Sequence, residues 1–262
     1  MKKFGNRLSV FAGAASLAAA TVALAASPAL ATTGDFTNGN FTSGNFSTNA
    51  LSSPGYDTLY PGGSSYLDGW TVTSGSVDLI GSYWTQPTTD TSGNAYSGYS
   101  LDMNGSPDSA NPSTPGTISQ TFTTVANATY EVQFLLAGNP TCGLFTKTLS
   151  VSATGGTSQS FSFINTSSTT QTSMGWTPEM YTFTANSATT TLTFAADTSN
   201  QSNCGPALAD VTVTQSASAT GAQCKDGGWQ SMVDPNNNYQ PFKNQGDCVS
   251  YYAVSGATPI GS

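Results

Sequence analysis

Residues 189–195 read Thr-Thr-Thr-Leu-Thr-Phe-Ala, so apolar side chains alternate with hydroxyl-bearing ones. In an extended strand successive side chains point to opposite faces, which puts Leu192 and Phe194 on one face and threonines on the other. A strand with one apolar and one polar face is typical of a sheet that covers a core on one side and meets water on the other. The stretch therefore predicts an antiparallel sheet.

Similar segments recur along the chain, each bounded by Gly, Pro, Asn or Ser. They are residues 70–74, 76–80, 99–103, 117–123, 129–136, 147–153, 159–164, 179–184 and 209–215. About ten short strands exceed what one sheet comfortably holds, and no helical pattern separates them. We therefore predict an all-β fold, an antiparallel β-sandwich of two packed sheets.

The first 31 residues have the three parts of a signal peptide. Basic Lys2, Lys3 and Arg7 precede an apolar, alanine-rich stretch, and Ala29-Leu30-Ala31 offers the small residues of a cleavage site. An uncleaved membrane anchor is the alternative, but the stretch is alanine-rich and ends at Pro28. We predict cleavage after residue 31, no membrane association afterwards, and a secreted location, either extracellular or associated with the cell wall.

Charge excludes several classes of partner. Without residues 1–31 the chain has three lysines and no arginine against fourteen acidic residues. Nucleic-acid phosphates and anionic lipids both attract clustered Lys and Arg, so neither is an expected partner. The chain has no histidine, which excludes Ser-His-Asp and Cys-His catalysis and the usual His-containing zinc sites.

Four cysteines in an exported chain predict two disulfides. Cys142 follows a turn after one core strand and Cys204 precedes the last strand, so we expect these two to pair. Cys224 would then pair with Cys248 in the tail. The predicted organisation is a signal peptide (1–31), a β-sandwich (32–215), a Ser/Ala/Thr/Gly-rich linker (216–223) and a small Cys-containing C-terminal element (224–262).

Several short sequence motifs follow one another between about residues 35 and 215. They include Asn38-Gly39-Asn40-Phe41, Gly69-Trp70-Thr71-Val72, Ser100-Leu101-Asp102-Met103-Asn104-Gly105 and Cys204-Gly205-Pro206-Ala207-Leu208. Together they resemble the choice-of-anchor C family of secreted bacterial surface proteins, which is similar to plant cell-wall proteins of unassigned role. The resemblance implies a galactose-binding-like jelly roll on a cell surface or in a wall, and it implies no catalytic residues.

Carbohydrate-binding sandwiches of similar shape often hold a structural Ca²⁺ through acidic residues that this chain lacks in part. Thr42 stands where those proteins have Glu, and Ala209 precedes Asp210 where they have paired acids. Two oxygen ligands are lost, so we predict no cofactor. Asn38 and Asp210 are the remaining candidates for holding a calcium ion.

Enzymatic activity is not expected from the acidic residues. A glycosidase needs two facing carboxylates, one of them with a raised pKa. Glu131 lies in a predicted strand, Glu179 follows a Trp-Thr-Pro turn, and most aspartates sit in turn contexts that favour Asp. Because no spacing singles out an acid and a base, we predict a protein without catalytic residues.

Aromatic residues gather between residues 55 and 100, largely in Gly/Ser/Pro-rich segments. Loops on a sandwich carry binding residues, and an aromatic ring stacks on the C–H face of a sugar without any charge. The alternative is that these rings pack within the loops or fill the sandwich edge. The candidate ligand-binding residues are Trp84 and Tyr83 foremost, then Tyr60, Tyr66, Tyr96 and Tyr99. Core positions are predicted for Trp70, Phe134, Phe183 and Phe194, and Trp176 is left open.

These observations predict noncatalytic binding of an extracellular or cell-wall polysaccharide. The alternative function is that of a structural or adhesive matrix protein that binds other surface proteins, with the C-terminal disulfide element as its contact. The two differ in partner, since one predicts a saturable sugar ligand and the other predicts retention by proteins.

Overall fold

The computed structural model of the chain describes residues 35–62, 66–107, 114–197, 203–216, 224, 228–231, 233–234 and 240–255. The predicted signal peptide and nearly all of the predicted linker lie outside these residues. No helix within the described segments is long and apolar enough to cross a bilayer.

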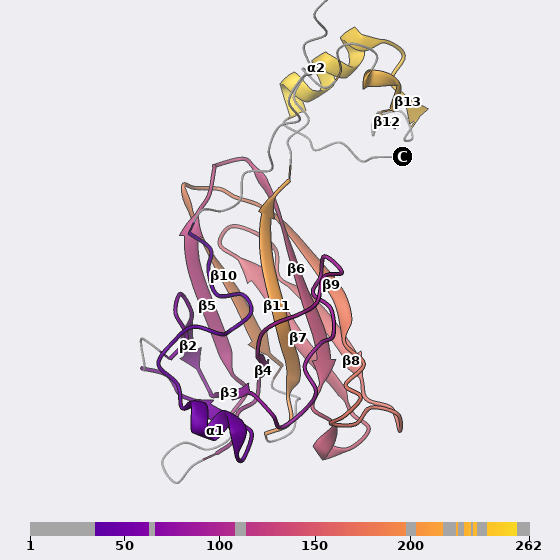
Figure 1. Cartoon of the computed structure of the whole chain (residues 1–262). Helices are drawn as coiled ribbons and strands as arrows, with labels where there is room; N and C mark the ends of the chain where they lie inside the picture. Colours follow the sequence, from indigo (N-terminus) through magenta and orange to yellow (C-terminus); the bar gives the residue numbers. More distant parts are fainter. Residues whose placement is uncertain are drawn as a thin grey trace, which may run out of the picture.

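Two antiparallel sheets face each other, and the predicted β-sandwich is confirmed (Figure 1). One sheet has six strands in the order β1-β3-β4-β11-β6-β9, which are Tyr56–Leu59, Val77–Ile80, Ser100–Asp102, Pro206–Gln215, Thr129–Gly138 and Thr177–Thr184. The other has five strands in the order β2-β5-β10-β7-β8, which are Thr71–Ser74, Thr117–Thr123, Thr189–Ala196, Thr146–Ala153 and Gln159–Ile164.

Shorter elements complete the described structure. Helix α1 (Thr48–Ser52) precedes β1, and Ser47 caps it by accepting a hydrogen bond from the Ala50 N–H. A 3₁₀ turn, η1 (Pro140–Cys142), follows β6. In the C-terminal element the described parts are η2 (Gly228–Ser231), the paired strands β12 (Val233–Asp234) and β13 (Gln240–Pro241), and helix α2 (Gln245–Ser255).

Strands β11 and β1 differ most from the sequence predictions. Strand β11 begins at Pro206, three residues before the predicted segment. Residues 206–209 are buried without alternation, so the period-two signal is absent there. Strand β1 was not predicted, because Tyr56–Leu59 lies in a Gly/Pro-rich stretch that reads as a loop.

The main core lies between the two sheets. Phe134 of β6 packs against Phe161 of β8 and Phe194 of β10, with ring centroids 5.1 and 5.3 Å apart. Trp70 reaches Phe194 from the segment before β2, at 6.0 Å. The four predicted core residues, Trp70, Phe134, Phe183 and Phe194, are all buried.

A second, smaller cluster covers the opposite face of the six-stranded sheet. We call it the outer-face cluster, and its buried members are Ile80, Trp84, Ala137, Met174 and Ala207. Alternation along the strands explains its composition. Leu79, Leu136 and Leu208 face the main core, so their neighbours Ile80, Ala137 and Ala207 face outward.

The predicted disulfide pairing is confirmed. Cys142 bonds to Cys204, with a Cα–Cα distance of 6.0 Å, and Cys224 bonds to Cys248, at 5.7 Å. The first joins η1 to the segment before β11, and the second lies within the C-terminal element. Cys224 and Cys248 pack with Phe242 in a small cluster of their own.

A chain that ends at Gln215 is expected to fold, because both sheets are complete at the end of β11. Urea unfolding of this truncated chain should remain a single cooperative transition. An aggregated or molten truncation would contradict the prediction, because it would show that the C-terminal element completes the main core.

Candidate functional site

A cleft of about 430 Å³ opens over the outer face of the six-stranded sheet. Loop residues 85–93 form one wall, residues 172–176 form the other, and Leu135 of β6 and Pro178 of β9 contribute from the sheet. Met174 belongs both to the lining and to the outer-face cluster. The cleft therefore rests on the cluster that packs against the sheet.

Two hydrogen bonds hold the walls together. The Thr85 N–H donates to the Gln171 carbonyl at 2.7 Å, and the Trp176 indole N–H donates to the Thr85 carbonyl at 3.2 Å. The indole of Trp176 is packed against the outer-face cluster and remains partly exposed in the cleft. Its orientation is thus set by a hydrogen bond on one side and by apolar contact on the other.

The lining mixes apolar side chains with hydroxyl groups and is nearly uncharged. Hydroxyl groups come from Thr85, Thr88, Thr89, Thr91, Thr172 and Ser173. Asp90 is the one charged residue of the lining, within the part of the chain that the structure describes. Its Oδ1 accepts from the N–H groups of Ser92 and Asn94 at 2.9 and 2.8 Å. This local turn largely satisfies the carboxylate.

Two buried oxygens of the cleft lining lack a hydrogen-bond partner. They are the side-chain carbonyl Oε1 of Gln86 and the hydroxyl Oγ1 of Thr91. The amide nitrogen of Gln86 donates to the carbonyls of Ile80 and Gly81, both at 3.0 Å, which fixes the orientation of the side chain. Buried polar atoms are normally paired, so both oxygens mark places where a water or ligand group would be favourable.

Trp84, the foremost sequence candidate, does not line this cleft. It is 3% exposed, belongs to the outer-face cluster, and donates its indole N–H to the Ser100 hydroxyl at 2.8 Å. A buried indole has no free face for a sugar, so the expectation for Trp84 is corrected to a core role. The sequence signal was misleading because the loop after β3 folds back onto the sheet.

The five candidate tyrosines do not converge on one groove. Tyr66 and Tyr99 pack against the main core, and the Tyr60 hydroxyl donates to the Ser106 carbonyl at 3.2 Å. The Tyr96 hydroxyl donates to the Tyr99 carbonyl at 2.6 Å. Burial, followed by the negative charge of Asp210, raises the pKa of Tyr96. Tyr83 packs on the outer-face cluster beside Tyr56.

The two calcium candidates have other partners. Asn38 donates its amide to the carbonyls of Ser43 and Asp68 at 2.7 and 3.1 Å. Asp210 sits at a β-bulge with a φ of 52° and accepts from the Thr91 N–H at 2.5 Å, so it ties the cleft loop to β11. Among the described residues, no group of three or more His, Cys, Asp or Glu is arranged to hold a metal ion.

A second, much smaller hollow, of about 40 Å³, lies at another part of the same sheet face. We call it the polar pocket; it is lined by Tyr56, Asp78, Ile80, Tyr83, Asp102, Ser106, Asn139 and Asn203. Asp78 of β3 and Asp102 of β4 are directly opposite each other in the strand register. Sequence reasoning did not single out either carboxyl.

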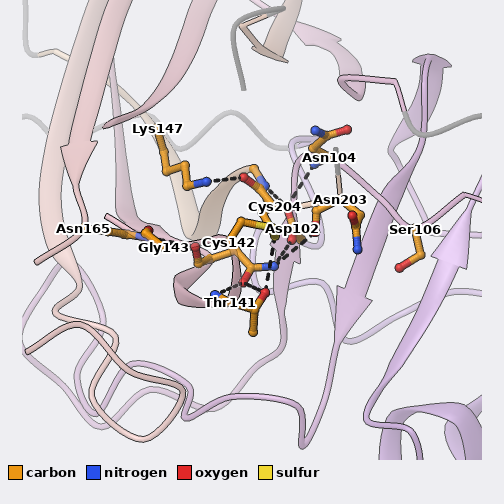
Figure 2. The surroundings of a disulfide bond; sticks show 12 residues. Asp102, Asn104, Ser106, Thr141, Cys142, Gly143, Lys147, Asn165, Asn203 and Cys204 are labelled. Carbon is orange, nitrogen blue, oxygen red and sulfur yellow. Dashed lines mark hydrogen bonds between the residues drawn. A yellow bond between two sulfur atoms is a disulfide. The ribbon is translucent and has the colours of Figure 1, made fainter. Parts of the chain in front are cut away.

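Hydrogen-bond donors surround both carboxyls. Asp102 lies beside Asn104 (Figure 2), and its Oδ1 accepts from the N–H groups of Asn104 and Gly205 at 3.0 and 2.8 Å. Its Oδ2 accepts from the Asn139 amide at 2.6 Å. Asp78 accepts from the Thr58 hydroxyl at 2.6 Å and from Ser106.

Burial dominates the electrostatics of this region. It raises the pKa of Asp102 to about 7, with the neighbouring charge of Asp78 acting in the same direction. Burial also raises the pKa of Asp78. The nearby Lys147 is 1% exposed, and its ammonium points at the Cys204 carbonyl (Figure 2). It donates to that carbonyl at 2.6 Å. Burial lowers the pKa of this ammonium.

Comparison with protein families gives one match. A family described as "Protein of unknown function (DUF642)" matches residues 34–214, most of the chain. The finer resemblance to the choice-of-anchor C family stays a prediction. Halomucin of Haloquadratum walsbyi is 29% identical over 168 residues, which are 63% of this chain and 2% of Halomucin. The chain thus spans a small part of that relative.

Solved structures similar to this one include carbohydrate-binding modules and an enzyme. TmCBM61 in complex with β-1,4-galactotriose has a TM-score of 0.36 and 16% identity, covering 69% of this chain and 97% of that chain. A family 35 module from Clostridium thermocellum has a TM-score of 0.36 and 13% identity, covering 60% and 96%. An arabinose-bound α-L-arabinofuranosidase, MgGH51, has a TM-score of 0.37 and 12% identity, covering 65% and 24%.

Replacement of Trp84 is expected to cost stability. Trp84→Ala leaves a cavity under the cleft and removes the bond to Ser100, so the free energy of unfolding should fall by about 3 to 5 kcal/mol. Trp176→Ala, at a partly exposed position, should cost about 1 kcal/mol or less. Urea unfolding of both variants provides the check. Equal stability of the two would contradict the burial of Trp84.

Stability should fall as pH rises from about 4 to about 7. The folded pKa of Asp102, about 7, lies above its ordinary value of 3.8, so the unfolded chain releases this proton first. The stabilisation is complete below the unfolded pKa and is lost as pH rises through the folded one, and Asp78 adds in the same direction.

Urea midpoints measured between pH 4 and pH 8 test this dependence. Asp102→Asn should be less stable at pH 4 and should show a shallower fall toward pH 8. Asp35→Asn is the control, because hydrogen bonds from Thr123 lower the pKa of Asp35 and its proton is lost below this window. A midpoint that rises through the window would contradict the buried state of Asp102.

Proposed function

We propose that this chain, which belongs to the family described as "Protein of unknown function (DUF642)", binds an extracellular polysaccharide without cleaving it. One observation carries the proposal. The partly exposed indole of Trp176 lies in the wall of a cleft that also offers several hydroxyl groups and the amide of Gln86 beside apolar side chains. A sugar offers the complementary surface, an apolar C–H face with hydroxyls around its edge.

The size of the cleft suits a ligand of this kind. Its volume of about 430 Å³ falls within the roughly 300 to 1,000 Å³ of typical small-molecule sites. The cleft is open to solvent, so a polymer can lie against it without having to thread through the protein. This shape favours recognition of residues within a chain over capture of an isolated small molecule.

The polar groups of the cleft fit neutral hydroxyls. Gln86 Oε1 and Thr91 Oγ1 lack partners, and the threonine hydroxyls of both walls can donate as well as accept. Asp90 is held by its own turn, and no Lys or Arg stands among the described lining residues to attract an anion. A neutral glycan is therefore the class of ligand that we propose.

Absence of catalysis is part of the proposal. Glycoside hydrolysis needs a second carboxyl group across the scissile bond. Among the described residues that line the cleft, Asp90 is the only carboxylate, and its bonds to Ser92 and Asn94 turn it toward its own loop. This arrangement supports binding without cleavage.

We also propose that the protein acts outside the cell. The signal-peptide pattern in residues 1–31 supports export. Both disulfides support an oxidising compartment, since such bonds persist mainly there. A glycan of the cell wall or of the surroundings would then be within reach of the cleft.

Trp176→Ala should weaken glycan binding about ten-fold, because one aromatic contact is worth roughly 1 to 2 kcal/mol. Trp176→Phe, which keeps a ring, should retain most of the affinity. Phe145→Ala, at a 52% exposed ring outside the cleft lining, is the matched control and should bind normally. The chain from Thr32 onward would be screened on a glycan array and its affinity for a hit measured by calorimetry.

Added salt should change the affinity for a neutral glycan little, since such a ligand offers no charge to screen. Unchanged binding by Trp176→Ala would remove the cleft as the site. Release of shortened sugars by the wild-type chain would overturn the noncatalytic part of the proposal.

A further inference from the structure

We propose that the polar pocket is a second binding site, which takes the primary ammonium group of an amino sugar. The pocket is separate from the cleft, and the two share no lining residue. The inference rests on the proposed function in one respect, namely that the ammonium is carried by a polysaccharide.

The size of the pocket limits what can enter it. Its volume of about 40 Å³ is roughly a tenth of that of the cleft, so a substituent enters it more readily than a whole sugar ring does. A sugar ring is far larger, so it would stay outside at Asn203, which is exposed, while one substituent points inward. Amine and hydroxyl groups are the smallest substituents that a sugar offers, and the acetamido group is bulkier.

The charge of the pocket selects the amine among these substituents. Asp78 and Asp102 lie directly opposite each other on neighbouring strands, where two ionised carboxyl groups repel each other. Asp57 adds a further negative charge near Asp78. Among the described lining residues there is no Lys or Arg.

The charge of Asp102 acts on the ammonium of Lys147, but Lys147 is not part of the pocket. Its ammonium donates to the Cys204 carbonyl at 2.6 Å. The pocket therefore keeps two carboxyl groups whose ionised form an incoming ammonium would favour. A hydroxyl group would bring only a dipole, so the carboxyl pair favours the charged substituent.

Two tyrosine rings supply the second element of ammonium recognition. Tyr56 and Tyr83 both line the pocket, with centroids 5.4 Å apart and an interplanar angle of 79°. Aromatic faces attract cations by about 0.5 to 2 kcal/mol, depending on how far the cation is desolvated. Carboxyl groups beside aromatic rings form an environment that suits an organic ammonium.

A metal ion fits the same pocket less well. Ca²⁺ takes six to eight oxygen ligands, whereas the oxygens of Asp102 already face the N–H groups of Asn104 and Gly205 and the amide of Asn139. A coordinated ion would have to displace these donors. An ammonium interacts at longer range and through ring faces, so it leaves the existing bonds in place.

The test compares two β-1,4-linked hexosamine hexamers that differ only in acetylation. Calorimetry with the chain from Thr32 onward would measure both the free-amine hexamer and the fully N-acetylated one. We expect the free-amine hexamer to bind at least about ten-fold more tightly in low salt, and we expect added salt to reduce this preference. Equal affinities for the two hexamers would overturn the inference.

Variants separate the pocket from the cleft. Asp78→Asn should abolish the preference for the free amine, and Tyr83→Leu should reduce it, while both keep the affinity for the N-acetylated hexamer. Because Asp78→Asn disturbs buried hydrogen bonds, thermal unfolding of each variant is measured alongside. If Asp78→Asn does not fold, the Tyr83→Leu variant is the deciding test. An unchanged preference in a folded Tyr83→Leu variant would count against the site.

Trp176→Ala tests the cleft independently, because it should weaken both hexamers by the same factor and leave the preference intact. If Trp176→Ala leaves the affinity for both hexamers unchanged and the preference for the free amine persists, the proposed function is wrong and the ammonium site stands. A lysine-containing peptide serves as the competing source of the same group. If it displaces the free-amine hexamer completely at equal concentration, the pocket recognises amines of proteins and the sugar assignment is wrong.

Discussion

Both proposed sites depend on the packing of the Trp84 indole against the outer face of the six-stranded sheet. The indole is buried beside Ile80, Ala137 and Ala207, and its N–H is satisfied by the Ser100 hydroxyl. The small side chains of Ala137 in β6 and Ala207 in β11 leave room for a large ring, so the segment after β3 packs against the sheet. The cleft then lies beyond this segment and the polar pocket lies beside Tyr83, at its start.

Alternation in the sequence was sufficient to predict the sandwich, because most strands have one face in the core and the other in water. Alternation gave no signal for strands that lack one buried and one exposed face. Residues 206–209 are buried on both faces, and Tyr56–Leu59 is a short edge strand within a turn-rich stretch. The disulfide pairing could be predicted because each pair lies within one unit of the chain.

The binding site was harder to predict, because the same loop composition is found in exposed and in buried aromatic segments. Trp84 and Trp176 both occur among Gly, Ser and Thr residues, yet one is buried and the other is partly exposed. Which one meets solvent is decided by tertiary contacts: Ser100 takes the indole N–H of Trp84, whereas Trp176 reaches across to the Thr85 carbonyl. The polar pocket had no sequence signal, since Asp78 and Asp102 become neighbours only through the pairing of β3 with β4.

The four tryptophans offer the most direct test of this account, because each carries one indole N–H that NMR can follow separately. The chain would be labelled with ¹⁵N and titrated with an oligosaccharide identified by glycan screening. The account predicts a saturable shift of the Trp176 indole signal, with the buried Trp70 and Trp84 signals nearly unchanged. A saturable shift of Trp84 with Trp176 unaffected would contradict it, because the ligand would then meet the residue that the fold buries.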